Sequence, residues 1–190
     1  MKISAVLLAG GESRRMGKDK PTLLFRGKPL WQIQLDLLCK LEPAEILVSA
    51  RADPAWRPAG VEFVPDEPPS RGPLSGLTAT LARIPSSHLL VLAIDMPFMN
   101  SKHLRYLCNA IGPRRGALPM IGSRAEPLAA IYPAEVYDMF ATALSGADFS
   151  MQTVTNQLVK IGMLRVVQVP EKEQGFYRNL NEPGDLDGVC

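Results

Sequence analysis

The chain is poor in the residues that build metal clusters, imidazole-based active sites and disulfide frameworks. Its 190 residues include 2 histidines and 3 cysteines. The cysteines (Cys39, Cys108 and Cys190) are far apart and form no CxxC pair, which argues against a disulfide scaffold and against a zinc site. A reducing compartment, the cytoplasm, is therefore the expected location.

Long apolar runs and a large charge of one sign are also missing. No apolar run approaches the ~20 residues of a membrane-spanning helix. The opening MKISAVLLAG contains an apolar stretch whose length is at the lower limit for the apolar region of a signal peptide, and Gly-Gly-Glu-Ser-Arg-Arg follows it. We expect no membrane contact. The net charge of +2 argues by itself neither for nor against nucleic acid, and we expect no such partner.

Positive charge is nevertheless concentrated near the N-terminus. Residues 1–30 contain seven basic residues against two acidic ones, a surplus of five, so the rest of the chain is slightly negative. Four of these cations follow Gly10-Gly11 at once: Arg14, Arg15, Lys18 and Lys20. A local positive field of this kind suits a small anionic ligand.

Apolar runs alternate with helical patterns along the chain. Runs of apolar residues, or of residues that are common in strands, predict strands at 3–8, 45–49, 61–64, 89–94, 116–121, 127–132 and 163–169. Apolar residues at helical spacing predict helices at 30–41, 75–83, 101–111 (with Ser101 as N-cap), 134–144 and 150–160. This alternation predicts an α/β protein with a mostly parallel, Rossmann-like sheet, helices on both faces and one domain over 1–190.

The turn after the first strand fits neither of two common phosphate-binding motifs. In the P-loop, GxxxxGK[ST], the glycines are closer than Gly11 and Gly17, and Asp19 stands where Ser or Thr is required. The dinucleotide motif leads straight into a helix, and none is expected before about Leu30. Glycines still let the backbone approach an anion closely. From these residues alone, an anion-binding turn and a solvated basic loop both stay open.

The complete sequence of residues 8–20, LAGGESRRMGKDK, resembles a known family signature. It is similar to LAGGxSxRMGxDK of the molybdenum cofactor guanylyltransferases, the MobA-type nucleotidyltransferases. Later segments resemble further family elements in the same order: RGKPLWQ (26–32), RGPLSGL (71–77), AIDMPF (93–98), EPLAAIYP (126–133) and NLNEPGDL (179–186). The resemblance covers essentially the whole chain and implies a fold like that of the nucleotide-diphospho-sugar transferases.

The resemblance also implies a reaction. GMP is transferred from GTP to the phosphate of molybdopterin (Mo-molybdopterin), with release of pyrophosphate and with Mg²⁺ as cofactor. A phosphate monoester is already an anion at neutral pH, so little general-base help is needed. This agrees with the positions of His88 and His103, which lie outside the motifs and are expected to be structural. GTP and molybdopterin are the expected partners, and contacts with other proteins of molybdenum cofactor biosynthesis stay open.

Three charged residues receive catalytic roles from the resemblance. Asp95 follows the run 89–94, so it is expected at the carboxyl edge of the sheet, facing Gly10-Gly11 if the strands are neighbours. A carboxylate there can hold Mg²⁺; the local sequence alone fits a turn aspartate before Met96-Pro97 equally well. Lys20 and Arg15 are implied to contact the triphosphate and to stabilise charge as pyrophosphate leaves.

The nucleotide-binding residues are likewise implied by the resemblance. Leu8, Ala9, Gly10 and Gly11 would contact the nucleotide through their backbone, and the pair Gly10-Gly11 favours GTP because CTP-using relatives carry LAAG, with one glycine fewer. Asp66 matches the family aspartate at the nucleoside pocket, where a carboxylate can accept two hydrogen bonds from guanine or ribose. Its local sequence also fits a turn residue in a proline-rich loop.

Two departures from the family pattern leave questions open. Ser49 stands where the family often has Asn, and Glu182 replaces the usual Thr of NxNTP. Asn179 and Asn181 keep the two amides, either near the second substrate or pinning the C-terminus. Two other functions remain: a nucleotidyltransferase of the same fold using CTP or a sugar-phosphate acceptor, and a nucleotide-binding module without turnover.

Overall fold

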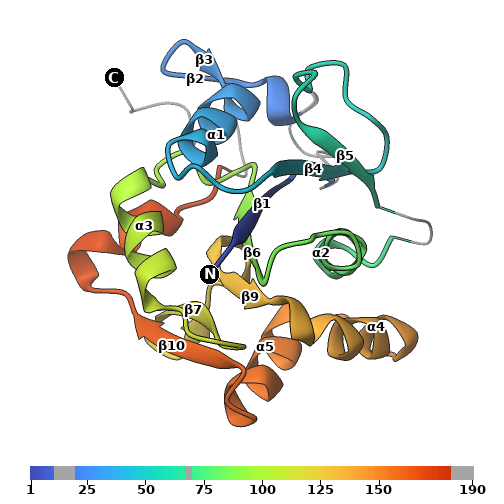
Figure 1. Ribbon diagram of the computed structural model, residues 1–190. Helices are drawn as coiled ribbons and strands as arrows, with labels where there is room; N and C mark the ends of the chain where they lie inside the picture. Colours follow the sequence, from blue (N-terminus) through green and yellow to red (C-terminus); the bar gives the residue numbers. More distant parts are fainter. Residues whose placement is uncertain (11–19, 67–69, 181–190) are drawn as a thin grey trace.

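The computed structural model describes residues 1–10, 20–66 and 70–180. Within them, an eight-stranded sheet runs through the protein in the order β10-β7-β9-β6-β1-β4-β5, with β8 paired to β7 (Figure 1). Its strands are β1 (Ile3–Leu8), β4 (Ile46–Ala50), β5 (Glu62–Pro65), β6 (His88–Ala93), β7 (Gly116–Ile121), β8 (Arg124–Ala125), β9 (Ile131–Pro133) and β10 (Leu164–Gln168). The strands β1, β4, β5 and β6 are parallel to one another, whereas β9 is antiparallel to β6 and β7.

Helices cover both faces of this sheet. They are α1 (Leu30–Cys39), α2 (Pro73–Leu81), α3 (Ser101–Ala110), α4 (Tyr137–Ser145) and α5 (Met151–Lys160). The helices α1 and α3 lie on one face, and α2, α4 and α5 lie on the other (Figure 1). The predicted α/β class, with a mostly parallel sheet between two helical layers, is therefore confirmed. Within the described ranges no helix has both the length and the apolar character needed to cross a bilayer.

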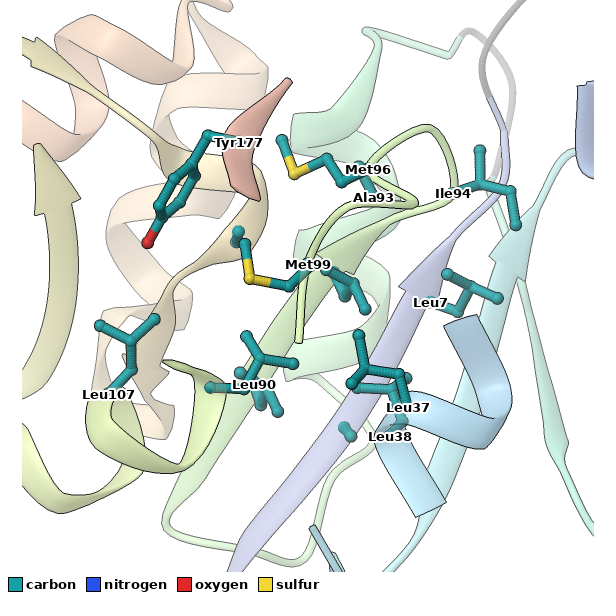
Figure 2. Packing of buried hydrophobic residues seen from close by; sticks show 14 of the residues in the cluster. Leu7, Leu37, Leu38, Leu90, Ala93, Ile94, Met96, Met99, Leu107 and Tyr177 are labelled. Carbon is teal, nitrogen blue, oxygen red and sulfur yellow. The ribbon is translucent and has the colours of Figure 1, made fainter. Parts of the chain in front are cut away.

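The two central strands explain why the core has two halves. Successive side chains of a strand point to opposite faces of the sheet. Ala5 and Leu7 accordingly pack under α1 and α3, while Val6 and Leu8 pack under α2, α4 and α5. The alternate residues of β6 divide between the same two clusters, one of which is drawn in Figure 2. A continuous apolar run is thus the sequence of a strand that is covered on both faces.

Several predicted boundaries and local assignments were wrong. The N-cap of α3 is Asn100, whose side chain accepts a 2.9 Å hydrogen bond from the His103 amide, and not Ser101. The predicted strand 127–132 is a 3-10 helix, η2 (Pro127–Ala129), followed by the short strand β9. A further 3-10 helix, η4 (Glu171–Tyr177), follows β10.

A small hairpin before α1 was missed. After the 3-10 helix η1 (Lys20–Thr22), strands β2 (Leu24–Phe25) and β3 (Lys28–Pro29) pair antiparallel. Arg26 and Gly27, at their tip, have φ angles of 51° and 74°. Positive φ at both central residues is the requirement of a type I′ turn. Strands of two residues carry no alternation in the sequence, so only the glycine indicated the turn.

A tight backbone contact at the start of β7 gives a test of the sheet packing. A Cβ on Gly116 would lie 1.9 Å from the carbonyl oxygen of Ile131 in β9. Because the obstacle is backbone in the neighbouring strand, we expect Gly116→Ala to lower the free energy of unfolding by about 3 kcal/mol. At Gly60 an added Cβ would have no atom within 4 Å apart from its neighbours in the chain, so Gly60→Ala should change the free energy of unfolding by less than about 1 kcal/mol. Urea unfolding of both variants measures this, and equal stabilities would contradict the strand packing described.

Candidate active site

Three neighbouring strands end together and bring their following residues to one place. In the sheet register, Leu8 of β1 lies beside Ser49 of β4 on one side and beside Ala93 of β6 on the other. The Ala9 amide continues this pattern by donating to the Ser49 carbonyl at 2.8 Å, and the Ile94 amide donates to the Leu8 carbonyl at 3.0 Å. The chain segments that leave the carboxyl ends of β1, β4 and β6 therefore meet at a single edge.

A pocket opens at this edge. Its described lining residues come from the strand ends and the residues that follow them, from η1, from the start of α2 and from η2. They are Leu8, Ala9, Gly10, Lys20, Ser49, Asp66, Gly72, Pro73, Gly76, Ala93, Ile94, Asp95 and Leu128. Six of the residues predicted for the site thus line one pocket: Leu8, Ala9, Gly10, Lys20, Asp66 and Asp95. The predicted Gly11 and Arg15 lie outside the described residues.

Lys20 and Asp95 face each other directly in this pocket. The Lys20 ammonium donates to Asp95 Oδ2 at 2.9 Å, across 75 positions of sequence. The two side chains are only 15% and 20% exposed, so water screens the pair incompletely. Asp95 follows β6 and Lys20 begins η1. The strands β1 and β6 are neighbours, and Gly10 and Asp95 line the same pocket. A cation and a carboxylate in contact can part to bind a phosphate and a metal ion respectively.

Asp66 lies on the other side of β1, after β5. Its side chain is 6% exposed, and its Oδ2 accepts a 2.7 Å hydrogen bond from the Ser70 hydroxyl. Its Oδ1 is buried and has no partner among the described residues. A buried carboxylate oxygen without a donor is costly, so a ligand that supplied an N–H or O–H there would be bound strongly. A Cβ on Gly10 would come within 3.3 Å of Asp66 Oδ2, so glycine keeps this approach open.

The start of α2 forms a wall that the sequence analysis did not assign. Gly72 is the N-cap of α2, with φ 69°, and Pro73 follows it as the first helical residue. Gly76, one turn later, lies so close to β4 that an added Cβ would be 2.6 Å from Ser49 Oγ. In the sequence, the two glycines around a proline in RGPLSGL (71–77) were the available signal for a close backbone approach. Leu128, from η2, had no such signal.

Neither histidine lines the pocket. His88 begins β6 at the opposite end from Asp95, and its Nε2 lies 3.1 Å from the Gly112 carbonyl oxygen. His103, in the first turn of α3, contacts Glu173 and Tyr177. Burial lowers the pKa of both imidazoles, which favours their neutral forms. The structural role expected for both histidines agrees with these contacts.

A mostly parallel α/β sheet with a lysine–aspartate pair and a glycine-bounded pocket at its carboxyl edge defines a nucleotidyltransferase-like fold and site. Residues 5–161 match the profile of the MobA-like NTP transferase domain. The chain belongs to this family of nucleotidyltransferases, as the resemblance of the sequence motifs predicted.

Relatives and solved structures agree with this assignment. A probable molybdenum cofactor guanylyltransferase from Opitutus terrae is 36% identical over 188 residues, which cover 97% of this chain and 93% of the relative. A protein of the same name from Natronomonas pharaonis is 30% identical, with 97% and 95% covered. The crystal structure of molybdopterin-guanine dinucleotide biosynthesis protein A from Archaeoglobus fulgidus superimposes with a TM-score of 0.74 at 24% identity, covering 98% of this chain and 96% of that one. This last likeness concerns the fold.

The contact between Ser49 and Gly76 can be tested by a double-mutant cycle. Gly76→Ala places a methyl group against Ser49 Oγ, so it should lower the free energy of unfolding by about 1–2 kcal/mol. In the Ser49→Ala background the obstructing oxygen is absent, and the same change should be neutral or stabilising, because Ala favours a helix over Gly. Urea unfolding of all four proteins gives the coupling energy. Purely additive effects would mean that α2 does not lie against Ser49.

Proposed function

We propose that the protein transfers GMP from GTP to the phosphate of molybdopterin, its 190 residues acting as one nucleotidyltransferase domain. The observation that carries this proposal is the joint position of Lys20, Asp95 and Asp66 around one pocket at the carboxyl edge of the sheet. The names of the relatives from Opitutus terrae and Natronomonas pharaonis support guanine nucleotide and molybdenum cofactor as the substrates.

The strand order divides the site into two ends. Asp66 and Ser49 lie on the β4–β5 side of β1, where they suit the nucleoside. Lys20 and Asp95 lie on the β6 side, where they suit the triphosphate. Asp66 would accept hydrogen bonds from guanine or ribose, and the backbone of Leu8, Ala9 and Gly10 would lie between the two ends. By the family signature, Gly11 would join these backbone contacts with the nucleotide, and Arg15 would contact the phosphates.

The donor set fits a hard divalent cation that arrives with the nucleotide. Asp95 offers carboxylate oxygens, the ligand type that Mg²⁺ prefers. The described residues contain no cluster of three or more acidic, histidine or cysteine side chains that could enclose a metal by themselves. Phosphate oxygens and water would therefore fill most coordination positions, as is usual for Mg²⁺. Asp95 would hold Mg²⁺ there, and the ion would supply charge neutralisation at the phosphates.

The reaction then needs positioning more than proton transfer. An oxygen of the acceptor phosphate forms a bond to the α-phosphorus of GTP, and the bond from that phosphorus to the bridging oxygen of the β-phosphate breaks. Pyrophosphate leaves with the electron pair. Lys20 would bind the phosphate oxygens on which negative charge builds up. The acceptor is already an anion, so the lack of an imidazole among the described lining residues is no obstacle.

Removing the Asp95 carboxylate should stop the reaction without unfolding the protein. We expect Asp95→Asn to lower the rate of pyrophosphate release from GTP and molybdopterin at least about 100-fold, because charge stabilisation at the transferred phosphate is lost. Asp138→Asn, at an exposed carboxylate of α4, should keep the wild-type rate. Full Mg²⁺-dependent activity in Asp95→Asn would disprove the metal assignment. Absence of turnover in the wild-type protein would favour a binding module.

Base selectivity tests the role of Asp66. Calorimetry should show tighter binding of GTP than of CTP, and Asp66→Asn should weaken GTP binding about 10- to 100-fold, the effect of losing hydrogen bonds to a charged acceptor. Glu62→Gln, an exposed change on the preceding strand, is the matched control and should have no effect. If CTP bound more tightly than GTP, the cytidylyltransferase alternative would replace the proposal.

A further inference from the structure

The segment that joins β6 to α3 carries Asp95, and the far end of the chain runs along it. Leu180 donates its amide to the Asp95 carbonyl at 2.8 Å. The guanidinium carbon of Arg178 lies 5.5 Å from the centre of the Phe98 ring. Tyr177 Oη lies 2.7 Å from Nε2 of His103. Residue numbers rise on one segment as they fall on the other, so residues 177–180 follow the segment 95–103 in the opposite direction.

A buried polar contact anchors this arrangement at its outer end. His103 and Tyr177 are each 5% exposed, and their rings meet edge to face with centroids 5.4 Å apart. The second ring nitrogen of His103, Nδ1, lies 3.2 Å from Glu173 Oε2. Since a carboxylate can only accept, Nδ1 carries the hydrogen, and Nε2 accepts from the Tyr177 hydroxyl. Met96, Met99, Leu107 and Tyr177 belong to one core cluster (Figure 2).

The inner end of the arrangement holds the backbone near Asp95 at two points. The Ile94 amide, just before it, is bound to the Leu8 carbonyl at 3.0 Å, and the Asp95 carbonyl is bound to Leu180. The carboxylate is thereby attached to backbone that is fixed from β1 on one side and from the C-terminal segment on the other. Such support helps a side chain that binds a metal ion or a substrate, because a small displacement of that side chain weakens its contacts.

From these contacts we infer that residues 171–180 form a strap that positions the Asp95 carboxylate, with Tyr177 and His103 as positioning residues. The inference rests on the proposed function, in which Asp95 holds the metal ion. A purely structural role for the strap would affect stability alone. A positioning role affects the metal affinity of the nucleotide complex more than the affinity for the nucleotide itself, because the strap contacts the Asp95 side of the pocket.

The test compares two variants that each lose one buried hydroxyl. Tyr177→Phe keeps the ring and its edge-to-face contact and removes only the hydroxyl bound to His103 Nε2. Thr155→Val removes a hydroxyl that is bound to the Met151 carbonyl within α5 at 2.7 Å, away from the site. For the full-length protein with GTP, the dissociation constant of Mn²⁺ is measured by electron paramagnetic resonance. We expect it to rise about five-fold in Tyr177→Phe, the effect of one lost hydrogen bond, and to be unchanged in Thr155→Val.

Binding of GTP in the presence of EDTA separates positioning from general loosening. It should change less than about two-fold in Tyr177→Phe, and His103→Phe, which keeps an aromatic ring, should behave in the same way. If Tyr177→Phe matched Thr155→Val, or lost GTP and Mn²⁺ affinity equally, the strap would have no positioning role. The Asp95→Asn variant distinguishes a failure of the proposed metal site from a failure of the proposed strap. Wild-type Mn²⁺ affinity in that variant would disprove the metal assignment itself, whereas loss there without loss in Tyr177→Phe would disprove the strap alone.

Discussion

The parallel pairing of β1 with both β4 and β6 places Leu8 between Ser49 and Ala93, and the site depends on that register. Side chains alternate along a strand, so a shift by one residue would turn every side chain of β1 to the other face. Both faces of β1 are buried, and such a shift would exchange the side chains of β1 between the two core halves. The apolar packing that stabilises the sheet therefore also fixes where Gly10 and Asp95 emerge from it.

The electrostatics of the pocket follow from this placement. Lys20 and Asp95 come together although 75 positions separate them in the chain. Each neutralises the charge of the other at a place where both side chains are largely shielded from water. A lone charge of either sign there would be poorly solvated. In the proposed reaction both charges exchange partners at once, Lys20 toward phosphate oxygens and Asp95 toward the cation that accompanies them. The pair itself is thus neutral before the nucleotide binds, and its two members suit the phosphates and the accompanying cation afterwards.

The sequence predicted the site best where a residue follows a long apolar run. Asp95 could be placed because β6 is wholly buried and ends just before it, and Gly10 because β1 ends in the same way. The family signature then pointed to Lys20. The wall formed by Gly72, Pro73 and Gly76 depends on how closely α2 packs on β4, which no periodicity encodes. The two-residue strands β2 and β3 and the 3-10 helix η4 are too short to leave a pattern.

The departure at Ser49 has a physical counterpart on α2. Ser49 Oγ already fills the space where a side chain on Gly76 would stand, so a longer side chain at position 49 would have to extend elsewhere. The neighbouring free volume is the pocket, which Ser49 and Gly76 both line. Serine in place of the asparagine that the family often has therefore leaves more room at the proposed nucleoside end of the pocket and removes one amide from it. In the proposed function, recognition of the base would then fall more heavily on Asp66, whose buried Oδ1 has no partner within the described residues.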